Sequence, residues 1–177
     1  HAWAPDAYEG ASVPVTAYMA TIIKAGVLLA VVRLFGNAIL ASPLLGLLAV
    51  LPLVSIVWGN LAAMRQQSFR RMIAYSSIAH AGYLFYAMLG DPAGRLQAVA
   101  FYVLAYGLLN LLAFAALPAA ADDRERDRLD NLKGLFQRAP FAALMIGIAM
   151  LSLAGIPPFP GFVAKFLIFR NVIAAGH

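Results

Sequence analysis

Cysteine is missing from the chain, and histidine is scarce. Without cysteine, the 177 residues cannot form disulfides, thiolate zinc sites or thiolate-bound iron–sulfur clusters. Two of the three histidines, His1 and His177, are terminal, so a haem held between two internal histidines is not available. We therefore expect the chain to hold no redox centre and to bind no metal or cofactor of its own.

Charged residues are also few, at 12% of the chain, whereas apolar residues reach 63%. A soluble domain has about 25% charged and about 45–50% apolar residues. The apolar excess is too large for one soluble core of this length, and it fits about five stretches of roughly 20 apolar residues. The sequence predicts an all-α, polytopic transmembrane helix bundle surrounded by membrane lipid.

The whole chain, 1–177, is expected to form a single membrane-embedded segment of a larger subunit. Five apolar stretches within it are expected to cross the membrane. The expected spans are about 13–35, 40–63, 69–89, 96–117 and 139–176, and the polar residues 118–138 are expected to form a cytoplasmic loop. Pro52 lies inside the second span, where a missing amide hydrogen usually kinks a helix. Ser68 is a candidate N-cap for the third span.

The fifth span is interrupted by the sequence IPPFPG at 156–161. Three prolines and a glycine cannot continue a helix, although the residues on both sides are apolar. One interpretation is a broken helix at membrane depth, which is tolerated where the freed backbone groups line a buried or water-filled cavity. The alternative is two separate segments joined by a tight turn at the surface.

Basic residues near the span ends predict the orientation of the chain. Eight lie on the side where the first span begins and three on the other side. The eight are Arg65, Arg70, Arg71, Arg124, Arg126, Arg128, Lys133 and Arg138, and the three are Arg33, Arg95 and Arg170. The positive-inside rule places the first group in the cytoplasm. This bias accounts for the net charge of +5, so no nucleic-acid partner is expected.

Lys24 lies at the midpoint of the first expected span, with 11 residues on each side. From there a lysine stem cannot reach the surface of a hydrocarbon core about 30 Å thick, so the ammonium must face a protein or water cavity. Ionisable groups at this depth are functional candidates, and Lys24 could gain and lose a proton. The alternative is a permanently paired lysine that holds two helices together.

Two stripes of polar side chains lie at helical spacing on the third and fourth expected spans. They consist of Ser76, His80 and Tyr83 on one span, and of Tyr102, Tyr106 and Asn110 on the other. Hydroxyl, imidazole and amide groups on facing helices can carry a proton directly or through ordered water. The alternative is hydrogen bonding that only secures helix packing.

Lys165 follows the Pro-rich interruption by four residues. Half-helix ends beside a break offer partial charges and open carbonyls that would act on this ammonium, whereas a surface turn would make Lys165 an interfacial anchor. No Asp or Glu lies inside any expected span. The buried set therefore favours groups that switch between neutral and cationic forms over a carboxylate cage for sodium.

Three long motifs occur in order along the chain. They are HAWAPDAYEGASVPVTAYMATIIKAG, GNLAAMRQQSFRRMIAYSSIAHAGYLF and LSLAGIPPFPGFVAKF. Together they resemble the antiporter-like subunits of respiratory complex I, the proton-pumping NADH:quinone oxidoreductase, and in particular the subunit N (chain 2) family. The resemblance covers nearly the whole chain and implies a fragment with roughly helices eight to twelve of a fourteen-helix subunit.

The resemblance implies a role for three of the candidate residues. Lys24 corresponds to the central linking lysine of the family, His80 to the histidine on its polar axis, and Lys165 to the exit-side lysine at its broken helix. The family's membrane glutamate and its paired lysine lie upstream of His1, so we expect that this segment does not pump protons in isolation.

The resemblance also implies what surrounds the chain. It implies a bacterial inner membrane, other membrane subunits of complex I as partners, neighbouring antiporter-like subunits among them, and proton translocation coupled to quinone reduction elsewhere. NADH, flavin, iron–sulfur clusters and quinone would be used by other subunits. The alternatives are a subunit of a multisubunit Na⁺/H⁺ antiporter or of a membrane-bound hydrogenase, and a structural scaffold whose buried lysines are silent.

Overall fold

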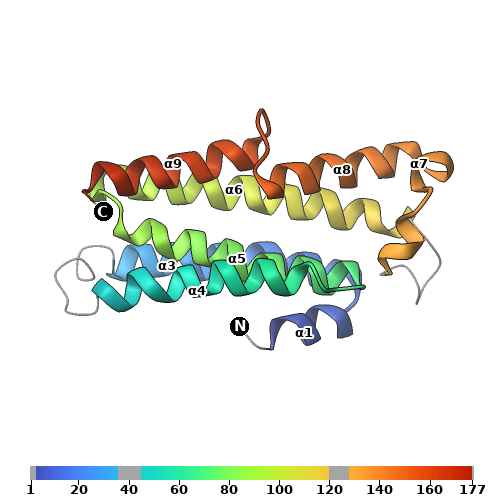
Figure 1. Ribbon diagram of the computed structural model, residues 1–177, viewed down its shortest axis with the longest axis horizontal. Coiled ribbons are helices and arrows are strands. Elements are labelled where there is room, and N and C mark those ends of the chain that lie inside the picture. Colours follow the sequence, from blue (N-terminus) through green and yellow to red (C-terminus); the bar gives the residue numbers. More distant parts are fainter. Residues whose placement is uncertain (1–2, 36–44, 120–127, 177) are drawn as a thin grey trace.

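The computed structural model describes residues 3–35, 45–119 and 128–176 (Figure 1). The start of the expected second span at 40–44 and residues 120–127 of the expected loop at 118–138 lie outside these residues. The helices are α1 Ala4–Gly10, α2 Val13–Tyr18, η1 Met19–Ile23, α3 Lys24–Phe35, α4 Leu45–Ala63, α5 Phe69–Tyr86, η2 Ala87–Leu89, α6 Pro92–Ala116, η3 Leu117–Ala119, η4 Leu129–Leu132, α7 Leu135–Arg138, α8 Pro140–Ala154 and α9 Pro160–Ala174. Within the described ranges the only β pairing is the isolated bridge between Ser68 and Arg128.

The long helices lie roughly along one common axis (Figure 1). Helix α4 packs mainly on α5, α6 packs on α3, α8 and α9, and the short helix α1 packs on α5. Buried residues of α5, α6, α8 and α9 make up most of the core. The all-α helix bundle predicted from the sequence is therefore confirmed.

Two connections between helices are fixed by side chains. The Ser68 hydroxyl accepts a hydrogen bond from the Arg71 amide at 3.4 Å, which confirms Ser68 as the N-cap of α5. At the start of α6, the Asp91 carboxylate accepts from the Ala93 amide at 3.2 Å. The Asn171 side-chain amide of α9 donates to the Asp91 carbonyl at 3.2 Å, so the α5–α6 turn is tied to the end of α9.

Helices α4 and α5 approach each other closely because glycines lie in their interface. A Cβ atom on Gly59 would lie 2.8 Å from the Tyr75 carbonyl oxygen, and one on Gly82 would lie 2.7 Å from the Pro52 carbonyl oxygen. Helix α4 continues through Pro52 rather than ending there. All of the expected second span that the structure describes, Leu45–Ala63, is thus a single helix packed against α5.

The last apolar segment forms α8 and α9 with a non-helical break at 155–159 between them. Both helices pack on α6, and they lie end to end along it, with the connecting loop standing out from the bundle (Figure 1). A broken helix has this arrangement, whereas two segments joined by a turn at one end of the bundle would lie side by side. The break consequently falls partway along the bundle, beside α6.

Two helical stretches, Val13–Leu34 and Pro92–Ala116, are long and apolar enough to cross a membrane, each with a mean hydropathy of 2.0. The apolar helices Ala49–Ala63 and Pro140–Ala154 are shorter. Large apolar side chains on α4, such as Leu51, Val54 and Trp58, are exposed, as lipid-facing side chains would be. The precise span boundaries stay predictions.

Candidate functional site

A π-helical turn, η1, interrupts the helix that carries Lys24. The turn covers Met19–Ile23, and Lys24 is the first residue after it. Within it the Thr21 hydroxyl donates to the Ala17 carbonyl at 2.7 Å. Single π-turns inside α-helices are frequent at functional sites. The apolar periodicity of the sequence does not reveal this change of helix type.

The Lys24 ammonium is buried between two aromatic rings. Its Nζ atom lies 5.5 Å from the centroid of Tyr8 and 5.7 Å from that of Tyr106. Among the residues that the structure describes, Nζ has no hydrogen-bond partner and no carboxylate pairs with it. A permanently paired lysine, the structural alternative, is therefore not what these residues show.

His80 lies at the centre of the two predicted polar stripes. Its side chain is 6% exposed, and its Nδ1 atom shares a 2.6 Å hydrogen bond with the Tyr102 hydroxyl. The centroid of the His80 ring lies 4.7 Å from that of Tyr106 and 6.1 Å from that of Tyr83. The structure thus brings Tyr83 of one stripe and Tyr102 and Tyr106 of the other together around one imidazole.

Only some of the polar atoms of Tyr106 and Asn110 have a hydrogen-bond partner among the described residues. The Asn110 amide donates to the Tyr106 carbonyl of its own helix at 2.8 Å. Within the described part of the chain, the Tyr106 hydroxyl and the Asn110 side-chain oxygen have no hydrogen-bond partner. Buried polar atoms without partners are costly, and ordered water commonly satisfies them.

Lys165 lies directly at the break between α8 and α9. Its ammonium donates to the carbonyl oxygens of Leu153 and Ala154 at 3.0 Å each, at the C-terminal end of α8. Its Nζ atom also lies 5.1 Å from the centroid of the Tyr83 ring. These contacts match the interpretation of a half-helix end acting on an ammonium, not that of an interfacial anchor.

These contacts form one continuous line through the bundle. Lys24 lies over the Tyr106 ring, the Tyr106 ring is tilted by 38° against that of His80, His80 lies beside Tyr83, and Lys165 lies over the Tyr83 ring. The members come from α3, α5, α6 and α9, so residues up to 141 positions apart in the sequence meet here. We call this set the cation line.

Space beside the cation line could hold water. A pocket of 420 Å³ is lined by Ser76, His80, Tyr83 and Lys165 together with Asn60 of α4. A much smaller cavity of 10 Å³, about the room of one water molecule, lies against His80 and Tyr102. Ser76 therefore faces the predicted site through the pocket.

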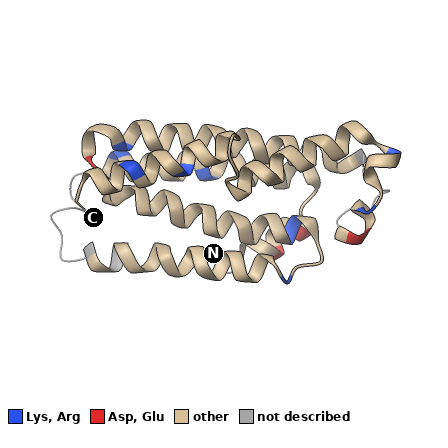
Figure 2. Ribbon diagram, turned by 45° about the horizontal axis from the view of Figure 1, so that its top comes forward, with Lys and Arg blue, Asp and Glu red and all other residues tan. Residues whose placement is uncertain are grey.

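The charges of the described chain are distributed unevenly along the bundle. Acidic residues lie toward its ends, whereas lysines and arginines also lie between the ends (Figure 2). The Asp6 and Glu9 carboxylates, for example, pair with Arg71 at 2.9 and 2.7 Å near one end. The cation line consequently runs through a region without a described carboxylate.

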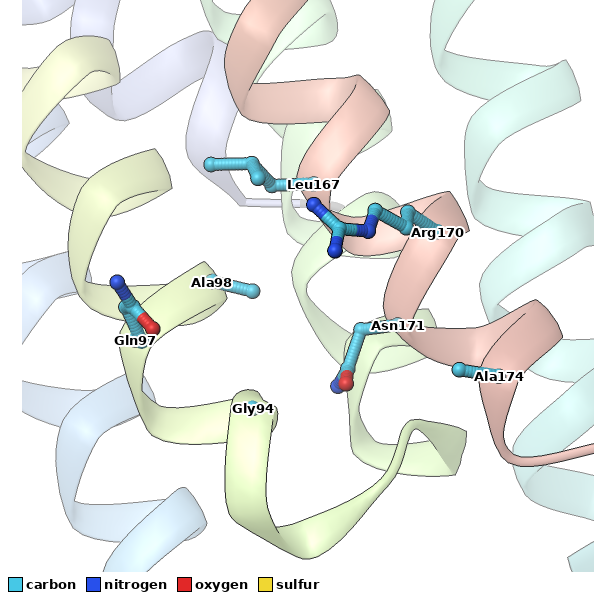
Figure 3. A pocket seen from close by; sticks show the side chains of 7 residues that line it. All are labelled: Gly94, Gln97, Ala98, Leu167, Arg170, Asn171 and Ala174. Carbon is cyan, nitrogen blue, oxygen red and sulfur yellow. The ribbon is translucent and has the colours of Figure 1, made fainter.

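A separate pocket of 280 Å³ lies between α6 and α9, toward the end of the bundle that holds the α5–α6 turn (Figure 3). Its lining includes Gln97, Arg170 and Asn171. None of the sequence-predicted site residues lines it, so it is not part of the cation line.

Sequence analysis missed two residues of the site, Tyr8 and Asn60. Tyr8 precedes the first expected span and reaches Lys24 only because α1 folds back onto α5. Asn60 is a lone polar residue near the end of an apolar segment, a position that is unremarkable in sequence. Its isolation within the otherwise apolar stretch IVWGNLAAM is the one signal that could have pointed to it.

Known proteins resemble this chain along its whole length. A family model described as "NADH:quinone oxidoreductase/Mrp antiporter, TM" matches residues 1–177. NADH-quinone oxidoreductase subunit N of Pelobacter propionicus is 46% identical over 177 residues, which cover 100% of this chain and 38% of that protein. Subunit N of Deinococcus radiodurans is 37% identical, with 100% of this chain and 36% of that protein covered.

A solved structure gives the same result in three dimensions. A chain of respiratory complex I from Thermus thermophilus, with bound aureothin, matches with a TM-score of 0.86 at 43% identity. The match covers 100% of this chain and 39% of that one, and the chain spans a similar share, about 38%, of its first curated relatives. The helices, their arrangement and the sequence agree, and the chain belongs to the NADH:quinone oxidoreductase/Mrp antiporter transmembrane family.

Proposed function

We propose that the chain is the part of a complex I subunit N that carries protons between its central lysine and its broken helix. The cation line is the observation that carries this proposal: the buried ammonium of Lys24 and the half-buried Lys165 are joined through His80 and aromatic rings. A static scaffold would pair its buried lysines with carboxylates, because an unpaired buried charge is expensive.

Electrostatics is the driving force in the proposed relay. A positive charge that approaches Lys24 from elsewhere in the complex disfavours its charged form and drives its proton toward His80 and Lys165. The described residues place no carboxylate beside Lys24 to cancel such a field. Each step then needs a change of field and of hydration, without covalent chemistry in this chain.

Water would complete the path between the side chains. Aromatic rings do not carry a proton by themselves, and the distances along the cation line exceed a hydrogen bond. The 420 Å³ pocket touches both His80 and Lys165, so hydrogen-bonded water there would connect them. Redox chemistry with NADH, flavin, iron–sulfur clusters and quinone is proposed for other subunits of the complex. The partners of this chain would be other membrane subunits, neighbouring antiporter-like subunits among them.

Lys24→Arg in the full-length subunit tests the proposal directly. Arginine keeps the positive charge but does not readily release its proton, so a relay stalls while a scaffold is unaffected. We expect NADH-driven acidification of inverted membrane vesicles to fall by roughly tenfold, an added barrier of about 1.4 kcal/mol.

The matched control for this variant is Arg33→Lys, which exchanges the same two residue types at an exposed position of the same helix. Its acidification should equal that of the wild type. Normal acidification in assembled Lys24→Arg complex would remove Lys24 from the relay and favour the scaffold.

His80→Ala is expected to have a milder effect than Lys24→Arg. Removal of the imidazole enlarges the cavity beside Tyr102 and Tyr106, and water can bridge the gap that it leaves. Acidification should be partly lost and still measurable in the same vesicles. A loss as complete as that of Lys24→Arg would show that the imidazole itself is an obligatory carrier.

A further inference from the structure

Tyr8 is a buried aromatic residue to which the proposed relay assigns no role. It belongs to α1 and is 2% exposed, and its ring lies as near to the Lys24 ammonium as the ring of Tyr106 in the cation line does. Within the described residues its hydroxyl has no hydrogen-bond partner. The contact of Tyr8 with Lys24 is made by its ring.

The ring faces a cation that has little else to stabilise it. The Lys24 ammonium lies 5.5 Å from the Tyr8 centroid, within the range of a cation–π interaction, and this attraction is larger where water is excluded. Lys24 Nζ lacks a described hydrogen-bond partner, so the faces of Tyr8 and Tyr106 are its only favourable described contacts. Both rings lie at similar distances from the ammonium, 5.5 and 5.7 Å.

Two ion pairs at the surface and one buried hydrogen bond hold α1 in the position that places this ring. The Arg71 guanidinium of α5 donates to the Asp6 carboxylate at 2.9 Å and to the Glu9 carboxylate at 2.7 Å. The Thr16 hydroxyl donates to the Tyr8 carbonyl at 3.0 Å. A helix of seven residues is not stable alone, so the place of α1 depends on such contacts.

We propose that Tyr8 is a positioning residue for Lys24, and that the ion pairs of Arg71 with Asp6 and Glu9 form a latch that keeps its ring over the ammonium. The inference rests on the proposed proton relay. With the latch closed, the ammonium stays between Tyr8 and Tyr106, in contact with the cation line. When the Tyr8 ring is lost or displaced, the ammonium is free to leave that contact.

The experiment compares Tyr8→Phe with Tyr8→Leu in the full-length subunit within the whole complex. Phenylalanine keeps the aromatic face, whereas leucine is apolar without one. We expect acidification per assembled complex to stay near wild type with phenylalanine. With leucine it should fall by roughly two- to thirty-fold, the range that corresponds to the loss of one cation–π contact.

The control for packing is Phe114→Leu, because Phe114 is equally buried and contacts the ring of Phe69 edge-on at 6.4 Å rather than a cation. We expect Phe114→Leu to lower the amount of assembled complex, if it has any effect. Acidification per assembled complex should stay at the wild-type level. If Tyr8→Leu behaves like Phe114→Leu, Tyr8 only packs and the inference is wrong.

Arg71→Gln supplies a second test that leaves Tyr8 in place. This variant tests the inference even if the Tyr8→Leu subunit fails to assemble. It removes the cation of the latch, and we expect a smaller loss of acidification in the same direction. Unchanged acidification in Arg71→Gln would overturn the role of the latch. If Lys24→Arg stalls pumping while both the Tyr8→Leu and Arg71→Gln variants pump normally, the relay stands and only this inference fails.

Discussion

Replacing Lys24 with alanine in the full-length subunit is expected to reduce NADH-driven acidification of inverted vesicles to roughly a tenth of wild type or less. The substitution removes the only ammonium that lies between Tyr8 and Tyr106, so the cation line loses its first proton carrier. The complex should still assemble, because no described hydrogen bond or ion pair of Lys24 Nζ is lost with it. Quinone-dependent NADH oxidation should fall together with acidification if the two are tightly coupled.

Lys133→Ala provides the matched control. Lys133 is an exposed lysine, 79% accessible, that pairs with Asp130 at 2.7 Å outside the core of the bundle. Surface pairs of this kind contribute little to stability, so both activities should remain. If acidification and NADH oxidation also persist in an assembled Lys24→Ala complex, Lys24 is structural and the proposed relay is wrong.

Gly161→Ala is expected to prevent the close approach of α8 and α9 at the break between them. The Gly161 amide donates to the Ser152 hydroxyl at 3.0 Å, and an added Cβ atom would overlap the Ser152 carbonyl group. Backbone cannot move aside as a flexible side chain can, so α8 and α9 must separate at their junction. Overpacking of an ordinary core position costs about 1–3 kcal/mol, and we expect a cost at the upper end of this range or above it.

The measurement is the amount of subunit in intact complex, separated on a native gel. Gly161→Ala should give much less assembled complex than wild type, and the remaining complex should acidify vesicles poorly because Lys165 is displaced. Gly147→Ala is the control on α8, because a Cβ atom there meets nothing within 4 Å. It should assemble normally, since alanine favours a helix over glycine. Normal assembly and pumping in both variants would mean that α8 and α9 do not meet as described.

The lysines of the cation line could be predicted from sequence because a charged side chain within an apolar span has a high free-energy cost. A lysine at the middle of an apolar span and a lysine beside a Pro-rich break have few explanations other than function. Helical spacing then placed His80 on the same face as Ser76 and Tyr83. These inferences need only local sequence and the properties of lipid.

What the sequence could not predict depends on contacts between distant segments or on backbone detail. The pairing of Lys24 with Tyr8 requires α1 to fold back, which no periodicity encodes. The π-turn of Met19–Ile23 differs from an α-helix by a shift of hydrogen-bond register that the apolar pattern tolerates. The choice between a broken helix and a surface turn likewise depended on how α8 and α9 pack on α6.

The contacts of Lys165 replace hydrogen-bond donors that the prolines at the break lack. In an uninterrupted helix, the Leu153 and Ala154 carbonyls would accept from residues 157 and 158, but both are prolines and have no amide hydrogen. Lys165 supplies the two missing donors. A lysine side chain has three hydrogens when charged and two when neutral, so the third is spare. Lys165 can therefore give up its charge while both carbonyls stay satisfied and the two half-helices stay joined.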